Sequence, residues 1–171
     1  MATRPKRAAA AHRDGPPRQA ALCYWLFKSE PESFSWTQQK SKGRKGEPWE
    51  GVRNFQARKN MRSMQLGDRG FFYQSGQGKD IVGIVEVCAR AHPDASDASG
   101  VWECVDVRAL ADMPKPVALA QVKANPKLAK MALVTSSRLS VQPVREQEWR
   151  EICAMGGLDP ERLTDAGSAR R

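Results

Sequence analysis

The chain has 171 residues and a formal net charge of +9, with 28 lysines and arginines against 19 aspartates and glutamates. Hydrophobic residues make up 40% and charged residues 27%, which indicates one globular domain able to bury a core without disulfides or metals. No apolar run approaches the roughly 20 residues of a membrane span, and the N-terminus lacks the apolar stretch of a secretory signal. We therefore expect a cytoplasmic protein that does not associate with membranes.

Part of the positive charge lies in the ends of the chain, because residues 1–20 hold five basic residues and one acid, and Arg170 and Arg171 stand at the other end. Residues 1–21 are rich in alanine, arginine and proline without apolar periodicity, which predicts a disordered basic tail. Residues 159–171 are expected to form a flexible C-terminal tail. The domain between them, residues 22–158, is only mildly basic, so its charge favours nucleic acid as a partner without deciding the question.

The first predicted element is a buried strand at Cys23–Phe27, a short aromatic and apolar run. Pro31 follows, and proline breaks a strand at this position. Either Ser33 or Ser35 is a candidate N-cap for a short helix. Residues 41–48 contain glycine and proline among basic residues, a composition that indicates a loop.

The centre of the domain predicts a helix followed by a hairpin. The helix is expected at Arg53–Met64, because Ala57 and Met61 share one face and basic residues occupy the other. Two strands then follow at Gly70–Ser75 and Asp80–Ala89, and the Gly-Gln-Gly turn between them indicates a β-hairpin.

The second half alternates between strands and short helices. We expect a polar loop at His92–Gly100, a strand at Val101–Leu110, helical turns within residues 119–132, a strand at Arg138–Val144 and a helix at Glu146–Met155. About six short strands with short helices between or after them indicate an α+β fold. A small barrel with peripheral helices satisfies this count and leaves no exposed sheet edge.

The residues that usually perform catalysis are sparse in this chain. His12 lies in the predicted tail and His92 in a predicted loop, which argues against a histidine-based nucleophilic site. Glu30 and Glu32 could act as an acid–base pair, although Glu-Pro-Glu is also an ordinary turn. No pair of cysteines has CxxC spacing, so we expect free thiols and neither a zinc site nor a cofactor. The four cysteines are Cys23, Cys88, Cys104 and Cys153.

The segment that leads into the central helix has the residue types needed to recognise a base or a phosphate. Gly51 permits close approach of another backbone, and Arg53 and Asn54 stand at the helix start, where free N–H groups favour anions. Aromatic residues such as Trp49 could stack on a base. Core packing is the commoner role of any single aromatic, so spacing alone identifies no pocket.

Several of these segments resemble the EVE domain, in the same order and over about Tyr24 to Leu158. The resemblance implies an α+β, PUA-like fold, which is a small mixed β-barrel with short peripheral helices. It also implies a non-catalytic reader of a modified base in DNA or RNA, without metal or cofactor. The blocks that carry the resemblance are Tyr24–Pro31, Trp49–Arg58, Gly67–Asp68, Phe72–Tyr73, Ile81–Ile84 and Arg138–Val144.

The resemblance implies a binding site made from the end of the first strand, the loop before the central helix, the aromatic strand and the start of the last strand. The ligand-binding residues expected on this basis are Lys28, Ser29, Glu30, Trp49, Gly51, Val52, Arg53, Asn54, Phe72, Tyr73, Ser137 and Arg138.

Side-chain chemistry suggests a role for most of these residues. Trp49 and Tyr73 are expected to stack on the base, and Ser29, Glu30 and Asn54 are expected to hydrogen-bond its edge. The cations expected to contact phosphates are Lys28, Arg53 and Arg138.

The chain departs from many bacterial EVE domains at two positions. Gln74 follows the Phe-Tyr pair where a histidine is common, and Thr135 stands near a position that often holds arginine. Two other functions stay open. The same cleft could bind a small molecule or a protein partner, or Glu30 could serve a base- or nucleotide-modifying enzyme.

Overall fold

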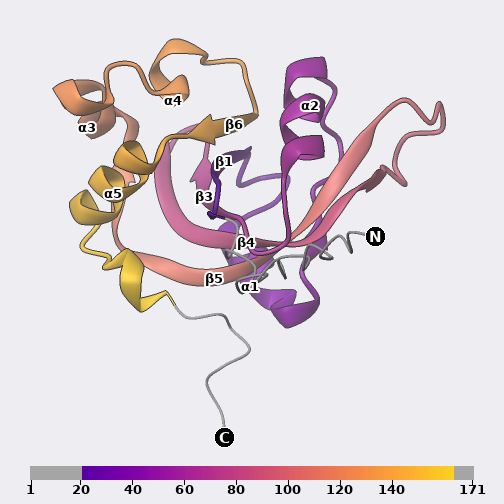
Figure 1. The fold of residues 1–171 in the computed structure, drawn as a ribbon, viewed down its shortest axis with the longest axis horizontal. Coiled ribbons are helices and arrows are strands. Elements are labelled where there is room, and N and C mark those ends of the chain that lie inside the picture. Colours follow the sequence, from indigo (N-terminus) through magenta and orange to yellow (C-terminus); the bar gives the residue numbers. More distant parts are fainter. Residues whose placement is uncertain (1–20, 164–171) are drawn as a thin grey trace, which may run out of the picture.

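The computed structural model describes residues 21–163, and the tails predicted at 1–20 and 164–171 lie outside the described part. Six strands form one mixed sheet, in the order β2-β5-β4-β3-β1-β6 (Figure 1). The strands are β1 Tyr24–Ser29, β2 Glu47–Pro48, β3 Arg69–Gln74, β4 Asp80–Pro93, β5 Glu103–Ala118 and β6 Val141–Val144. The helices are α1 Trp36–Ser41, α2 Phe55–Ser63, α3 Leu119–Ala124, α4 Ala132–Thr135 and α5 Glu146–Met155, with 3-10 turns η1 Gly43–Lys45, η2 Pro126–Leu128 and η3 Pro160–Arg162.

The sheet carries a hydrophobic core on each face. Successive side chains of a strand point to opposite faces, so neighbouring residues enter different cores. Leu26 of β1 packs in the first core, which also contains Trp149 of α5. Phe27 packs in the second core, which lies beneath α1 and α2. β1 runs parallel to β3 and pairs Phe27 with Phe72, which also enters the second core.

The long strands β4 and β5 curve strongly and continue beyond the sheet as an arm beside α2 (Figure 1). Their antiparallel pairing shifts register at several points between Ile81 and His92. Such bulges bend a strand and increase its twist. The curvature lets the same two strands contribute side chains to both cores.

Helix α2 bridges the two edges of this curved sheet. Among residues 21–163, no strand pairing joins β6 to β2, so the barrel expected from the sequence is not closed by backbone hydrogen bonds. Asn60 on α2 donates to the Val141 carbonyl of β6 at 2.8 Å, and Arg62 binds Glu103 of β5 through two hydrogen bonds of 2.8 and 2.7 Å. A helix placed here covers strand edges that would otherwise be open to another chain.

Local patterns predicted most elements, and the main differences lie at their ends. The predicted hairpin is confirmed as β3 and β4, and the predicted helix at Glu146–Met155 is confirmed as α5. The predicted strand Val101–Leu110 is wrong at its C-terminal end, because β5 continues through Pro114 and Pro116. Proline is tolerated there because the two-residue strand β2 covers β5 only around Asp106 and Val107, which leaves an outer edge.

The packed domain extends past the expected boundary at Leu158. Leu163 is buried in the first core, and its carbonyl accepts a hydrogen bond of 2.7 Å from Arg69 Nη2. The prediction of a flexible tail is therefore wrong for residues 159–163. No helix in the described range 21–163 has the length and apolar character needed to cross a membrane.

Candidate nucleic-acid site

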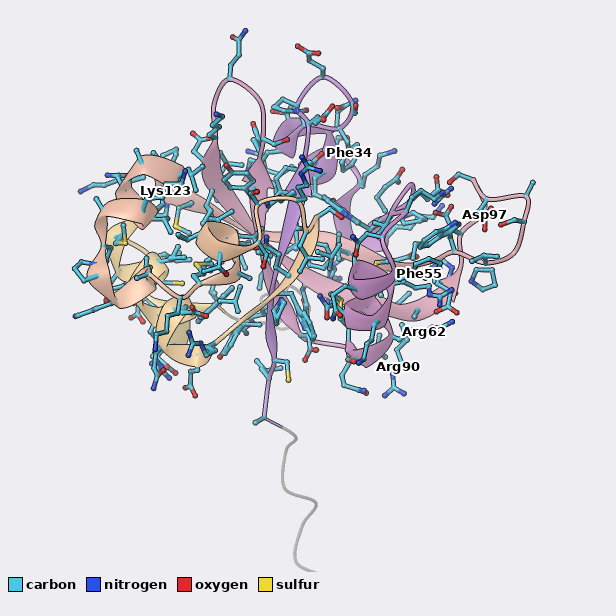
Figure 2. The ribbon with its side chains drawn as sticks, turned by 90° about the horizontal axis from the view of Figure 1, so that it is seen from above. Phe34, Phe55, Arg62, Arg90, Asp97 and Lys123 are labelled. Atoms are coloured by element: carbon cyan, nitrogen blue, oxygen red, sulfur yellow. The ribbon has the colours of Figure 1, made fainter. Side chains whose placement is uncertain are left out.

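A cleft of about 370 Å³ opens where the C-terminal end of β1 meets the segment that runs from β2 into α2. Lys28–Glu30 form one wall, and residues 47–53 form the other. Ser33 and Phe34, from the turn after β1, and Ser140, just before β6, complete the lining (Figure 2 labels Phe34). Small-molecule sites have volumes of about 300–1,000 Å³, so the cleft can accept a ligand the size of a nucleobase.

Trp49 forms the apolar floor of this cleft. Only 7% of the residue is exposed, and its ring meets the rings of Phe27, Phe34 and Phe72 edge-on at 5.2, 6.3 and 5.7 Å between centroids. Its backbone N–H donates to the Val105 carbonyl at 2.7 Å, which ties this segment to β5. These contacts fix the indole, so the floor is a rigid surface.

The end of β1 supplies a cation and a hydroxyl. Lys28 Nζ donates to the Ser137 carbonyl at 2.7 Å and lies 5.9 Å from the centroid of the Tyr73 ring. Partial burial lowers the pKa of Lys28 from its ordinary value. Ser29 Oγ donates to the Phe34 carbonyl at 2.5 Å and so holds the turn that carries Phe34. The hydroxyl oxygen of Ser29 can still accept a hydrogen bond.

Asp94 organises the opposite wall from the loop between β4 and β5. Its Oδ2 accepts hydrogen bonds from the Gly51 N–H at 2.9 Å and from Arg53 Nη1 at 3.0 Å. Gly51 has a φ of +82°, a conformation that glycine adopts without strain. Burial by itself would raise the pKa of Asp94, but hydrogen bonds from Ser96, Gly51 and Arg53 hold it well below its usual range.

A shallower hollow adjoins the cleft at the N-terminus of α2. Asn54, Ser137 and Arg138 lie along it, together with Thr135. Asn54 is the N-cap of α2, and its Oδ1 accepts a hydrogen bond of 2.9 Å from the Ala57 N–H. The hydrogen bond from Lys28 to Ser137 connects this hollow to the cleft.

Comparisons with known proteins identify the family of this chain. The sequence profile of the EVE domain matches residues 23–155. The chain belongs to the EVE-domain family. The chain is 32% identical to thymocyte nuclear protein 1 of Gallus gallus over 88% of this chain and 75% of the relative.

Solved EVE-domain structures share the fold. An Agrobacterium tumefaciens protein has 62% identity and a TM-score of 0.80, with 84% of this chain and all of that chain covered. The human THYN1 protein, crystallised in complex with DNA that contains 5-methylcytosine, has 30% identity and a TM-score of 0.72. The match covers 81% of this chain and 99% of the THYN1 chain. A YTH domain of Zygosaccharomyces rouxii, in complex with N6-methyladenosine RNA, shares the fold alone. Its identity is 18% and its TM-score is 0.50, and the match covers 88% of this chain and 96% of the YTH chain.

The cleft of this EVE domain brings together seven of the twelve residues predicted from the sequence. Five others lie elsewhere. Asn54, Ser137 and Arg138 border the adjoining hollow, whereas Phe72 and Tyr73 are buried in the two cores. Tyr73 also lines another hollow, which it shares with Lys28 and Ser137. The seven that line the cleft are Lys28, Ser29, Glu30, Trp49, Gly51, Val52 and Arg53.

The predicted sandwich of a base between Trp49 and Tyr73 is wrong. Phe72 is fully buried behind Trp49 in the second core. Tyr73 is its neighbour on β3 and therefore points to the opposite face, where it belongs to the first core and is 4% exposed. Asn54 Oδ1 is occupied as the cap of α2, which leaves the Nδ2 amide as the group that could donate the expected hydrogen bond to a base edge.

Sequence reasoning missed Phe34 and Asp94. Phe34 lies in a serine-rich turn whose only local signal is for helix capping. Asp94 lies in a segment that was assigned to a polar loop, and its contacts with Gly51 and Arg53 cross more than 40 positions of sequence. No local pattern in the sequence signals such a contact.

Three side chains that could hold a divalent metal lie together on β4 and β5, outside the cleft lining. The ligand atoms of His92, Cys104 and Asp106 are all within 4.8 Å of one another. His92 Nε2 lies 2.6 Å from Asp106 Oδ1, and Cys104 Sγ lies 3.8 Å from each ring nitrogen. Sequence spacing did not indicate this cluster, because only the pairing of His92 with Cys104 across the two strands creates it.

Proposed function

We propose that this EVE domain binds nucleic acid, captures one modified base in the cleft between Lys28–Glu30 and Trp49–Arg53, and catalyses no reaction. The observation that carries the proposal is the cleft itself, which combines a rigid aromatic floor with a polar rim. The homologous human THYN1 protein was crystallised with DNA that contains 5-methylcytosine, which supports a ligand of this class.

The chemistry of the cleft suits a base with an exocyclic amino group. Glu30 and Glu50 are exposed at its rim, and a carboxylate accepts hydrogen bonds from an amino group such as N4 of cytosine. Phe34 and Trp49 offer an apolar surface against which a methyl substituent would lose its contact with water. A base with both features gains more in this cleft than one that lacks the methyl group.

Two cations beside the cleft are available for phosphate groups. Among residues 21–163, neither Lys28 nor Arg138 forms an ion pair with a carboxylate. Lys28 lines the cleft, and Arg138 borders the hollow next to it. Contacts from lysine and arginine to phosphates orient a strand without reading its sequence.

A binding role without catalysis is favoured by the surroundings of the rim carboxylates. Glu30 is exposed, and its side chain has no hydrogen-bond partner in the described part of the chain. A catalytic acid or base is usually held in place by burial and by hydrogen bonds to its neighbours. His92 is bonded to Asp106 and is not part of the cleft lining.

Fluorescence anisotropy with matched oligonucleotides tests the proposal. Single-stranded and duplex DNA and RNA would each carry cytosine or 5-methylcytosine at one central position. We expect tighter binding of the modified single strand, because a duplex must first release the base from its stack. Glu30→Gln should weaken binding, whereas Glu32→Gln should not, because Glu32 is exposed nearby but does not line the cleft.

Equal affinity for the modified and unmodified oligonucleotides, with no effect of Glu30→Gln, would contradict a base-reading cleft. The salt dependence separates nucleic acid from a small apolar ligand, because phosphate contacts release counterions and weaken steeply as salt is added.

A further inference from the structure

A second aromatic surface lies outside the cleft, at the start of α2. Phe55 is 63% exposed, and its ring packs against that of Trp102 with 4.8 Å between centroids and an interplanar angle of 34°. Figure 2 shows Phe55 on the outside of α2, beside the arm whose loop carries Asp97. We call Phe55, Trp102 and Arg58 the platform.

The side chain of Arg58 completes the platform. The guanidinium carbon of Arg58 lies 5.0 Å from the centroid of Phe55 and 5.7 Å from that of Trp102. Its Nη1 donates to the Val101 carbonyl at 2.7 Å, which ties α2 to the arm. Among residues 21–163, Arg58 forms no ion pair with a carboxylate within 4.0 Å; its charge helps to lower the pKa of Glu103 from a greater distance, and its guanidinium can also attract an anion.

Core packing does not explain why Phe55 is aromatic. The inward face of α2 is formed by Ala57 and Met61, which are fully buried, and Phe55 points away from it. Four large hydrophobic residues of the described chain are exposed, and two of them, Phe55 and Val101, lie at this place. A contiguous exposed apolar surface of this kind marks a candidate binding site.

The platform and the cleft are contiguous through Arg53. This residue lines the cleft, and its guanidinium carbon lies 5.8 Å from the centroid of the Trp102 ring. Its hydrogen bond to Asp94 fixes the side chain between the two surfaces. A strand that places one base in the cleft would therefore meet the platform with a neighbouring nucleotide.

We propose that the platform is a second stacking site, which holds the unpaired base next to the one captured in the cleft; this inference rests on the proposed function. Every nucleobase has a π-face and can stack on an aromatic ring or on a guanidinium plane. Arg58 adds attraction for the phosphate that links the two nucleotides. The platform reads no sequence, but it adds affinity and favours single-stranded or locally opened nucleic acid.

A length series of ligands tests this inference by isothermal titration calorimetry. The ligands are 5-methyl-2′-deoxycytidine monophosphate, a trinucleotide with 5-methylcytosine at its centre, and the same trinucleotide with abasic flanks. We expect Phe55→Ala to weaken binding of the trinucleotide about tenfold, because stacking one base contributes on that order. Binding of the monophosphate and of the abasic ligand should change less than twofold.

Two further variants make the result specific. Phe55→Leu keeps an apolar side chain without a π-face, so it should weaken the trinucleotide nearly as much as Phe55→Ala. Leu66→Ala is the matched control, because Leu66 is another exposed hydrophobic residue, 57% accessible, and it lines a different hollow together with Tyr24 and Arg150. It should leave every affinity unchanged.

The outcomes separate this inference from the proposed function. If Phe55→Ala binds the trinucleotide as tightly as the unaltered protein while Glu30→Gln weakens all three ligands, the platform is wrong and the cleft stands. If Phe55→Ala weakens the trinucleotide while Glu30→Gln changes nothing, the platform stacks a base but the cleft captures none, which overturns the proposed function and the role of the platform as a second site beside the cleft. If Phe55→Leu binds like the unaltered protein, the surface is a general apolar contact, as for a protein partner, and the stacking site is overturned.

Discussion

Asp94 holds Arg53 at the mouth of the cleft through a hydrogen bond of 3.0 Å between Oδ2 and Nη1. The same oxygen accepts the Gly51 N–H, so one carboxylate fixes both the backbone and the side chain of this wall. Asp94 is 3% exposed and lies on the loop of the β4–β5 arm. The arm thereby sets the shape of a cleft to which it contributes no lining residue.

Replacement of Asp94 by asparagine should loosen the cleft and destabilise the domain. Asparagine keeps the shape but loses the charge that Arg53 requires, and its amide would face the Gly51 N–H or Arg53 with a donor. Hydrogen bonds to a charged group contribute about 1.5–3 kcal/mol, so we expect a loss of about that size in the free energy of unfolding. Urea denaturation measures it. An unchanged midpoint would contradict the structural role of Asp94.

The contribution of Asp94 should also depend on pH. Its folded-state pKa lies below the ordinary value of 3.8, so the stabilisation is present above that value and is lost as the pH falls toward the folded-state pKa. The difference in unfolding free energy between the unaltered protein and Asp94→Asn should be constant at neutral pH and shrink on acidification below about pH 4. A difference that grew with acid would contradict this account.

Trp49→Ala should lower the stability of the domain so much that its effect on binding cannot be read separately. The ring is almost fully buried against three phenylalanines, and truncation of such an aromatic costs about 3–5 kcal/mol. Phe34→Ala removes a half-buried ring of the same cleft. We expect it to lower the free energy of unfolding about half as much as Trp49→Ala does, and to lower the affinity for the oligonucleotide about equally. Thermal unfolding and anisotropy of both variants check this contrast. A greater stability loss for Phe34→Ala than for Trp49→Ala would refute it.

Gly83→Ala should destabilise the second core. A Cβ atom at Gly83 would lie 2.1 Å from Cζ2 of Trp36, whose indole N–H is held by Asp112 at 2.7 Å. Overpacking of this kind costs about 1–3 kcal/mol. Gly78→Ala is a suitable comparison, because its Cβ would meet only the flexible carboxylate of Asp80 at 3.2 Å. In chemical denaturation, Gly83→Ala should therefore show a clearly lower free energy of unfolding than Gly78→Ala.

Arg138→Gln should reduce the salt dependence of nucleic-acid binding. If Arg138 contacts one phosphate, its loss should lower the slope of log affinity against log salt by about 1, with the preference for the modified base unchanged. Arg90→Gln is the control, because Arg90 is exposed but lies along neither the cleft nor the adjoining hollow. Equal slopes for the two variants would show that Arg138 makes no phosphate contact.

The sequence predicted the elements whose signals are local. The periodicity of Ala57 and Met61 predicted the buried face of α2, and the helix predicted at Glu146–Met155 is α5. Alternation along β3 could also have placed Phe72 and Tyr73 on opposite faces, which would have prevented the wrong pairing of Tyr73 with Trp49.

The features that the sequence did not predict depend on contacts between distant segments. Helix α2 bridges the sheet edges through Asn60 and Val141, which are 81 positions apart. The cleft depends on Asp94, which lies 41 positions after Arg53. The spacing of residues along the chain does not encode which loop folds over which strand, so these contacts required the three-dimensional structure.

The central claim is that the cleft holds the base, and backbone amide chemical shifts measured by NMR test it most directly. A ¹⁵N-labelled sample would be titrated with the trinucleotide that contains 5-methylcytosine and with its unmethylated counterpart. The account predicts that the largest differences between the two titrations occur at Ser29, Glu30, Gly51 and Arg53. Differences centred on the separate hollow near Tyr24 and Arg150, or identical shifts with both ligands, would contradict it.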